Sequence, residues 1–330
     1  SGPEATGAVG AAGGAGAEGA AAGRPAAEAA AAAEETERAG PVILVERFRL
    51  NGGDAAGAEL LEGFRHALLA SLARFREWRV ADAAEGNGPV EAGGARYRLR
   101  ADAQGAGLAT ALTLVEAGSG VIVWSDRFAL DRSGWAAAQG RLLRQAVTAL
   151  NLHLAGDRSA RGVEATERGP TLHDLWLRAQ TGLRAFRPEG WREAEGAIAE
   201  ALRRAPDWAP GWSARALLLT TAHMAAPGLP REAAREVEAL SAARRGAALD
   251  PLDARGRLAL GWALAFRGDW DGACAALAEA ERPNDNDDWL LISAAAGRAA
   301  AGEGEAAARL VAAAVEAGRM DRPRWAFVAG

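Results

Sequence analysis

The sequence contains no lysine, so all 38 of its basic residues are arginine. This absence excludes, within the chain, the phosphate-binding loop of P-loop NTPases, a Schiff-base lysine and the lysine of protein kinases. The single cysteine, Cys274, can form no disulfide within the chain, and it occupies a helical position that is expected to be buried. No apolar run approaches the roughly 18 residues that a membrane-spanning helix needs. No signal segment opens the chain, and we expect no membrane span.

Histidine is also scarce, and the four histidines, at positions 66, 153, 173 and 223, lie far apart in the sequence. None belongs to a metal-ligand spacing, so we interpret them as surface or core residues. The acidic run at 284–288 lacks the glycine and the terminal glutamate of an EF-hand loop, and we expect it to be a solvated turn. The sequence therefore predicts no metal site, no cofactor and no catalytic residue, and we expect that the chain is not an enzyme.

The first 40 residues include 26 alanines and glycines and no aromatic residue. Such a segment cannot bury enough surface to offset the entropy that is lost on ordering. Gly14, Gly16 and Gly19 have the spacing of a dinucleotide-binding loop, but no strand precedes them, and low complexity explains the spacing. We predict that residues 1–40 are a disordered linker or tail.

A 34-residue repeat near the end of the chain is its most informative feature. Small and apolar residues recur at fixed places, since Gly261, Gly268, Ala273, Leu277 and Ala280 return as Ala295, Gly302, Ala307, Val311 and Ala314. Most of these places also occur 79 residues upstream of the first set, as Gly182, Ala194, Ile198 and Ala201. That separation is two periods plus eleven residues, so one repeat carries an insertion of eleven residues.

A 34-residue period with small residues at fixed places predicts tetratricopeptide helix pairs. In such a pair, a small residue on the first helix lets the second helix pack closely. We predict four units, at 175–208, 209–253, 254–287 and 288–321, within a repeat region at 175–330. An ordinary alanine-rich helical bundle is the alternative, and it accounts less well for spacings that coincide over three units.

Residues 41–155 have the pattern of a mixed α/β domain. The apolar run at 42–48 suits a buried strand, and 59–75 places apolar residues on one helical face. Short gaps with glycines predict successive antiparallel strands further along the chain. The complete prediction is strands at 42–48, 78–81, 95–101, 108–116 and 121–130, helices at 59–75 and from Ser133 to about residue 154, and a linker at 156–174.

Four sequence motifs stand out in this domain: PVILVERF at 41–48, LARF at 72–75 before WRV at 78–80, GARY at 94–97, and ALTLV at 111–115 leading to VWSDRF at 123–128. Together with the repeats that follow, they resemble the TolB-like amino-terminal domain of bacterial adenylate-cyclase-type proteins and CadC-like transcriptional regulators. The family usually has a helix before the third motif, whereas 85–93 is short and glycine-rich here. The resemblance implies a regulatory and interaction region whose output lies in a separate winged-helix or cyclase domain, and neither is visible in this chain.

Stacked repeats leave the inner surface made by their first helices open to an extended partner. Projecting the helical period from Gly261 places Arg255, Trp262 and Phe266 near that face, and the equivalent places in other units are Trp176, Leu183 and Trp289. Aromatic and arginine side chains are good anchors for a peptide, so we predict that these six residues bind a partner. The alternative is packing, because eight of the 11 tryptophans lie from Trp176 onward and more than half are expected to be partly buried.

The predicted fold is thus a mixed α/β amino-terminal domain plus an all-α tetratricopeptide-type solenoid. We interpret the chain as a non-catalytic regulatory module that binds a protein, a peptide or another domain of its parent through the groove. A net charge of −5 argues against nucleic-acid binding, and we expect a cytoplasmic location. A scaffold subunit of an envelope or secretion assembly, or an enzyme within the α/β domain, are the alternatives. Because the chain begins with serine and ends like the start of a further helix, we expect a fragment or processed chain.

Overall fold

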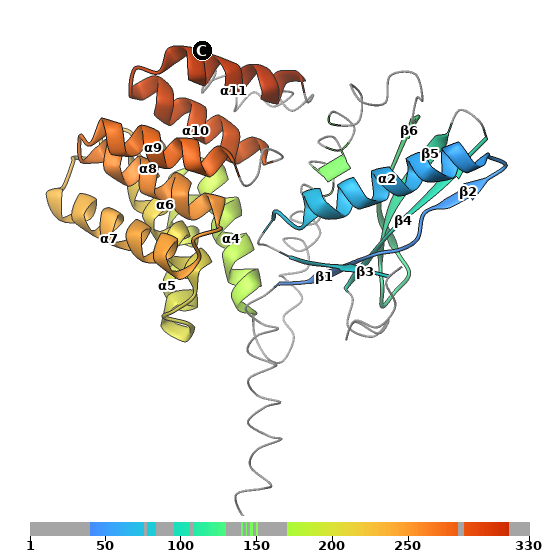
Figure 1. The fold of residues 1–330 in the computed structure, drawn as a ribbon. Coiled ribbons are helices and arrows are strands. Elements are labelled where there is room, and N and C mark those ends of the chain that lie inside the picture. Colours follow the sequence, from blue (N-terminus) through green and yellow to red (C-terminus); the bar gives the residue numbers. More distant parts are fainter. Residues whose placement is uncertain are drawn as a thin grey trace, which may run out of the picture.

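The computed structural model describes residues 40–75, 78–83, 96–105, 108–129, 170–282 and 287–316, together with the five positions 140, 143, 146, 147 and 150. Residues 1–39 of the tail predicted at 1–40, most of the linker predicted at 156–174 and most of the helix expected from Ser133 lie outside these residues. Figure 1 shows two parts, a sheet with a long helix and a stack of helices.

The amino-terminal part is a mixed sheet with strand order β3-β1-β4-β5-β6, in which β2 also pairs with β4. Strand β1 is parallel to β3 and β4, whereas β4, β5 and β6 are antiparallel to one another, as predicted for these three. The observed strand β1 is shorter than the strand predicted at 42–48, and the separate strand β2 was not predicted. The elements are β1 (Val42–Val45), β2 (Arg49–Asn51), α2 (Ala55–Leu72), β3 (Arg79–Asp82), β4 (Tyr97–Gln104), β5 (Ala109–Glu116) and β6 (Ile122–Ala129).

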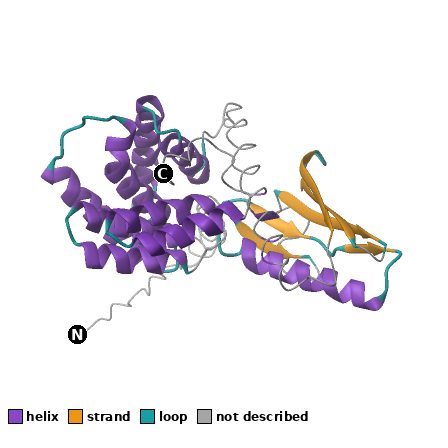
Figure 2. Cartoon of the chain, turned by 90° about the horizontal axis from the view of Figure 1, so that it is seen from above, coloured by secondary structure: helices purple, strands orange, loops and turns teal. Residues whose placement is uncertain are grey.

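One face of this sheet is covered by α2 (Figure 2). The helix begins earlier than predicted because Asp54 caps it, accepting a hydrogen bond from the backbone N–H of Gly57 at 2.9 Å. Side chains alternate along β4, so that every second one points to the core. The shared core contains, among others, Phe64, Leu68, Leu72, Tyr97, Leu99, Leu112, Leu114, Leu143, Val147 and Leu150.

The carboxy-terminal part consists of eight described helices that pair into four antiparallel hairpins, and each first helix also packs against the first helix of the next hairpin (Figure 1). This arrangement confirms the predicted solenoid of tetratricopeptide type. The first helix begins before the predicted boundary at 175, because Thr171 and Asp174 form a capping box there. The hairpins are α4 (Leu172–Arg184) with α5 (Pro188–Arg204), α6 (Ala209–Ala225) with α7 (Ala233–Leu249), α8 (Ala254–Phe266) with α9 (Trp270–Glu281), and α10 (Asp288–Ala300) with α11 (Gly304–Glu316).

The recurring small residues lie where the two helices of a hairpin meet. A Cβ atom on Gly261 would lie 2.7 Å from Cγ of Leu277 on the facing helix. A Cβ atom on the equivalent Gly182 would overlap the carbonyl oxygen of Gly190. Alanine fits at Ala295, which is 2% exposed. Small side chains at one repeated place therefore set the close approach, which is the basis on which the repeats were recognised.

The eleven-residue insertion lies in the second hairpin. Its first helix, α6, has 17 residues where α8 has 13, and its second helix, α7, has 17 where α9 has 12. Residues 226–232 connect the two helices, where only 267–269 connect α8 to α9. Since Ala216 of α6 aligns with Gly261 of α8, the additional turn of α6 is at its carboxyl end. The second hairpin is therefore longer than the third at the end that carries its loop.

Candidate functional site

Four of the six residues predicted to bind a partner are inside the solenoid. Trp176 and Leu183 are each 6% exposed, Arg255 is 7% exposed and Trp289 is 4% exposed. Trp262 and Phe266 are partly exposed. The inner face predicted to be open is filled, at the four buried positions, by the chain's own large side chains. Only Trp262 and Phe266 remain accessible to a partner among the six.

Contacts between hairpins, including hairpins that are not adjacent, explain this burial. The guanidinium of Arg255 donates from Nη2 to Oδ2 of Asp287 at 2.9 Å, and its carbon Cζ lies 4.9 Å from the ring centre of Trp176. Cζ of Arg184 lies 5.5 Å from the ring centre of Trp289. The first hairpin therefore contacts both the third and the fourth across the inside of the stack. These contacts leave no room for an extended peptide at the buried positions.

The prediction that the acidic run is a solvated turn is wrong for Asp287. This residue is 1% exposed, and it caps α10 by accepting a hydrogen bond from the backbone N–H of Leu290 at 3.2 Å. Burial alone would raise the pKa of its carboxyl group, but Arg255, Arg184 and the Leu290 N–H outweigh burial and hold the pKa below its usual value of 3.8. Asp287 is therefore a structural anion. Residues 284–286 of the run lie outside the described part of the chain.

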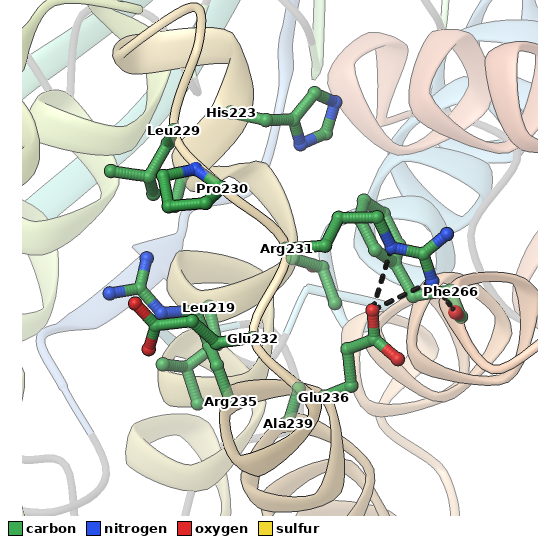
Figure 3. Close-up of a pocket in the computed structure, with 12 residues that line it drawn as sticks. Leu219, His223, Leu229, Pro230, Arg231, Glu232, Arg235, Glu236, Ala239 and Phe266 are labelled. Carbon is green, nitrogen blue, oxygen red and sulfur yellow. Dashed lines mark hydrogen bonds and ion pairs between the residues drawn. The ribbon is translucent and has the colours of Figure 1, made fainter.

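An accessible pocket of about 530 Å³ lies at the other end of the first helices, beside the long loop of the second hairpin. Its lining comes from α6, the loop before α7, the first turn of α7, α8 and the turn after it, the start of α9 and the end of α10. A smaller hollow shares His223, Arg231, Glu236 and Phe266 with it and extends along the loop. Figure 3 shows this hollow, with Arg231 and Phe266 on one side and Arg235 on the other. We call the two together the loop pocket.

Arg231 fixes the loop to the third hairpin. It donates from Nε to Oε1 of Glu236 at 2.8 Å and from Nη2 to the backbone carbonyl oxygen of Phe266 at 2.7 Å (Figure 3). That carbonyl belongs to the last turn of α8, where carbonyl groups have no partner within the helix. One side chain thus joins the inserted loop, α7 and α8, so the wall of the pocket is held in place.

Aromatic side chains form much of the rest of the pocket. The ring of Phe266 lies 5.2 Å from that of His223 and 6.5 Å from that of Trp262, measured between ring centres. Trp270, the first residue of α9, is 46% exposed, and Arg267 is exposed next to Phe266. These side chains provide an apolar surface with a cation at its edge. The arrangement suits recognition of another molecule.

Sequence reasoning found two residues of this pocket and missed Arg231, Arg267 and Trp270. The helical projection selected one face of each first helix, and these three residues lie in or just after connections between helices. The eleven-residue insertion was the one feature of the sequence that could have indicated this pocket. The insertion makes the second hairpin longer than the third, and the additional length forms one side of the loop pocket.

Within the described ranges, no group of three or more histidine, cysteine, aspartate and glutamate residues could hold a metal ion. In the same part of the chain, no helix is both long and apolar enough to cross a membrane.

No protein-family model matches the sequence, and no match is found among curated proteins. One solved structure similar to this chain is that of a thermophilic TPR protein from Thermus thermophilus, with 20% sequence identity and a TM-score of 0.39. The alignment covers 59% of this chain and 91% of that protein.

Proposed function

We propose that this chain is a non-catalytic regulatory module whose helical repeats bind a protein partner at the loop pocket. The observation that supports the proposal is the contrast between the filled inner face and the loop pocket. The inner face is filled at four predicted positions, whereas the loop pocket presents Trp262, Phe266 and Trp270 in partly exposed positions. Aromatic side chains on rigid helices bind well because they offer large apolar area and lose little conformational entropy.

The parent of such a module is also part of the proposal. The resemblance of the amino-terminal motifs to TolB-like domains supports a role within a larger transcriptional regulator or cyclase-type protein. The mixed sheet with three antiparallel strands is compatible with that resemblance. This parentage implies a cytoplasmic location, and the partner is then another protein or another domain of the parent.

A site-specific photo-cross-linking experiment tests the binding surface. Benzoylphenylalanine replaces Trp270 in one variant and Leu252 in another; Leu252 is 71% exposed in the turn between α7 and α8 and serves as the matched control. We expect a protein from the source cells to cross-link at position 270 and not at 252. The same set of cross-linked proteins at both positions would contradict the proposal.

The captured protein is then purified and its affinity measured by calorimetry. We expect Trp270→Ala to weaken binding about tenfold or more, which corresponds to ~1.4 kcal/mol, and Leu252→Ala to leave it unchanged. Circular dichroism of both variants verifies that the solenoid is intact. Equal affinity of the wild type and the Trp270→Ala variant would rule out the loop pocket as the binding surface.

A further inference from the structure

Among the described residues that line the loop pocket, Arg231, Arg235 and Arg267 are cationic, and Glu232 and Glu236 are anionic. Arg231, with a side chain that is 71% exposed, and the exposed Arg267 lie at its edge. Among the described residues that line the larger cavity, Glu236 is the one carboxylate, and it already accepts a hydrogen bond from Arg231. Arg267 has no ion-pair partner within the described part of the chain. An anionic group on a ligand would therefore find a cation that no internal carboxylate neutralises.

The backbone that carries Arg267 has a defined conformation at the end of α8. Gly268 has φ of +78°, a conformation that favours glycine at the end of a helix. The N–H groups of Arg267 and Asp269 both donate to the carbonyl oxygen of Leu264, at 3.0 Å each. The turn that carries Arg267 is thus part of the end of α8. Asp269, the nearest acidic residue in sequence, caps α9 by accepting from the N–H of Gly272 at 3.0 Å.

The apolar surface lies directly beside that cation. Phe266 precedes Arg267 in the chain, and Trp270 follows three residues later at the start of α9. Trp262 lies one helical turn before Phe266, with their ring centres 6.5 Å apart. A ligand that covers the aromatic rings therefore brings its neighbouring groups next to the guanidinium of Arg267.

We infer that the loop pocket recognises a peptide segment in which a large apolar side chain has an aspartate or glutamate next to it in the sequence. The apolar side chain packs on Phe266 and Trp270, and the carboxylate pairs with Arg267. This inference rests on the proposed function, since it assigns a ligand chemistry to the same surface. A basic side chain at the place of the carboxylate is disfavoured, because a lysine or arginine there would lie next to the uncompensated cation of Arg267.

Selection from a random peptide library displayed on phage, with the complete chain as bait, tests the inference. We expect the enriched peptides to contain an aromatic or large aliphatic residue adjacent to an acidic one. Synthetic copies of these peptides should lose affinity about two- to fivefold with Arg267→Ala, as is typical for an exposed ion pair, and about tenfold with Arg267→Glu. Their affinity should also fall as the salt concentration rises.

Arg244→Glu is the matched control, because Arg244 is an exposed arginine on α7 and lies outside the pocket lining. It changes the net charge as Arg267→Glu does, and we expect it to leave peptide affinity within twofold of the wild type. Peptides that lose binding with Trp270→Ala but carry no acidic residue would overturn this inference and leave the proposed function standing. Enriched peptides whose binding is unaffected by Trp270→Ala would overturn both.

Discussion

Replacing Asp287 by asparagine removes one charge from the ion pair inside the solenoid and leaves the shape of the side chain almost unchanged. Asparagine is also a good N-cap residue, so the hydrogen bond from the N–H of Leu290 is retained. The variant therefore leaves Arg255, which is 7% exposed, without the carboxylate that lies 2.9 Å from its Nη2 atom. Any loss of stability then reports on the charge of Asp287 and its attraction to Arg255 and Arg184.

The expected loss in the free energy of unfolding is about 3 kcal/mol. Removing one partner from a buried ion pair generally costs about 3 to 5 kcal/mol, because the remaining charge is buried without compensation. The lower end applies here, since the guanidinium of Arg255 keeps its contact with the ring of Trp176 at 4.9 Å. Asp287→Ala should lose ~1 kcal/mol more, because it removes the cap of α10 as well.

The same pair predicts how stability depends on pH. The pKa of Asp287 is lower in the folded chain than its usual value of 3.8, so its charged form stabilises the fold. This contribution is complete above the pKa of the unfolded chain, and it is lost as the pH falls below about 4 and through the lower pKa of the folded chain. The wild type and Asp287→Asn should therefore differ by a constant amount above pH 5 and converge below pH 4.

Urea unfolding of the complete chain, followed by circular dichroism at pH values between 7 and 3, measures both effects. Glu279→Gln is the control, because its carboxylate is 50% exposed and pairs with Arg257 at 3.2 Å on the surface. We expect that control to change the unfolding midpoint little. If Asp287→Asn unfolds within 0.5 kcal/mol of the wild type at pH 7, on the order of a surface substitution, the assigned role of the buried pair is wrong.

Three further predictions concern packing, the loop and the thiol. Gly182→Ala should destabilise the chain by about 1 to 3 kcal/mol in urea unfolding, because the added Cβ overlaps Gly190. Gly196→Ala should stabilise it by ~0.5 to 1 kcal/mol, because a Cβ at this position of α5 meets no other atom. The reverse order of stability would refute the packing argument. Arg231→Ala should speed backbone hydrogen exchange at 226–232 with little change in global stability, and unchanged exchange would show that this side chain does not hold the loop. Burial raises the pKa of the Cys274 thiol, so alkylation at pH 8 should be slower in the folded chain than in urea, and equal rates would contradict that.

The repeat architecture was predictable because it depends on local spacing. Gly182 and Gly261 each lie at the closest approach of two helices that are neighbours in the sequence, so one requirement recurs at one interval. The antiparallel order of β4, β5 and β6 was predictable for a similar reason, since short connections join consecutive strands. Strand β2 was missed because its pairing with β4 is not local.

Burial inside the stack was not predictable in this way. A helical projection shows which face of α8 carries Arg255, and it does not show how close another hairpin comes to that face. The distance is decided by contacts such as that between Arg255 and Asp287, which are 32 residues apart in the chain. For the same reason Arg255→Ala is a poor test of partner binding, because it would disturb the fold.

The loop pocket illustrates a more general relation between repetition and recognition in solenoids. Residues that follow the repeat pattern are mostly used in stacking, because the same positions must pack against the next unit. The residues of the second hairpin that break the pattern, between 227 and 234, are all exposed or partly exposed, so they contribute little to stacking. Arg231 holds these residues against α8, and they form one side of the loop pocket, which also contains Phe266 and Trp270. A departure from the period is therefore a better guide to the proposed binding surface of this chain than the repeated positions are.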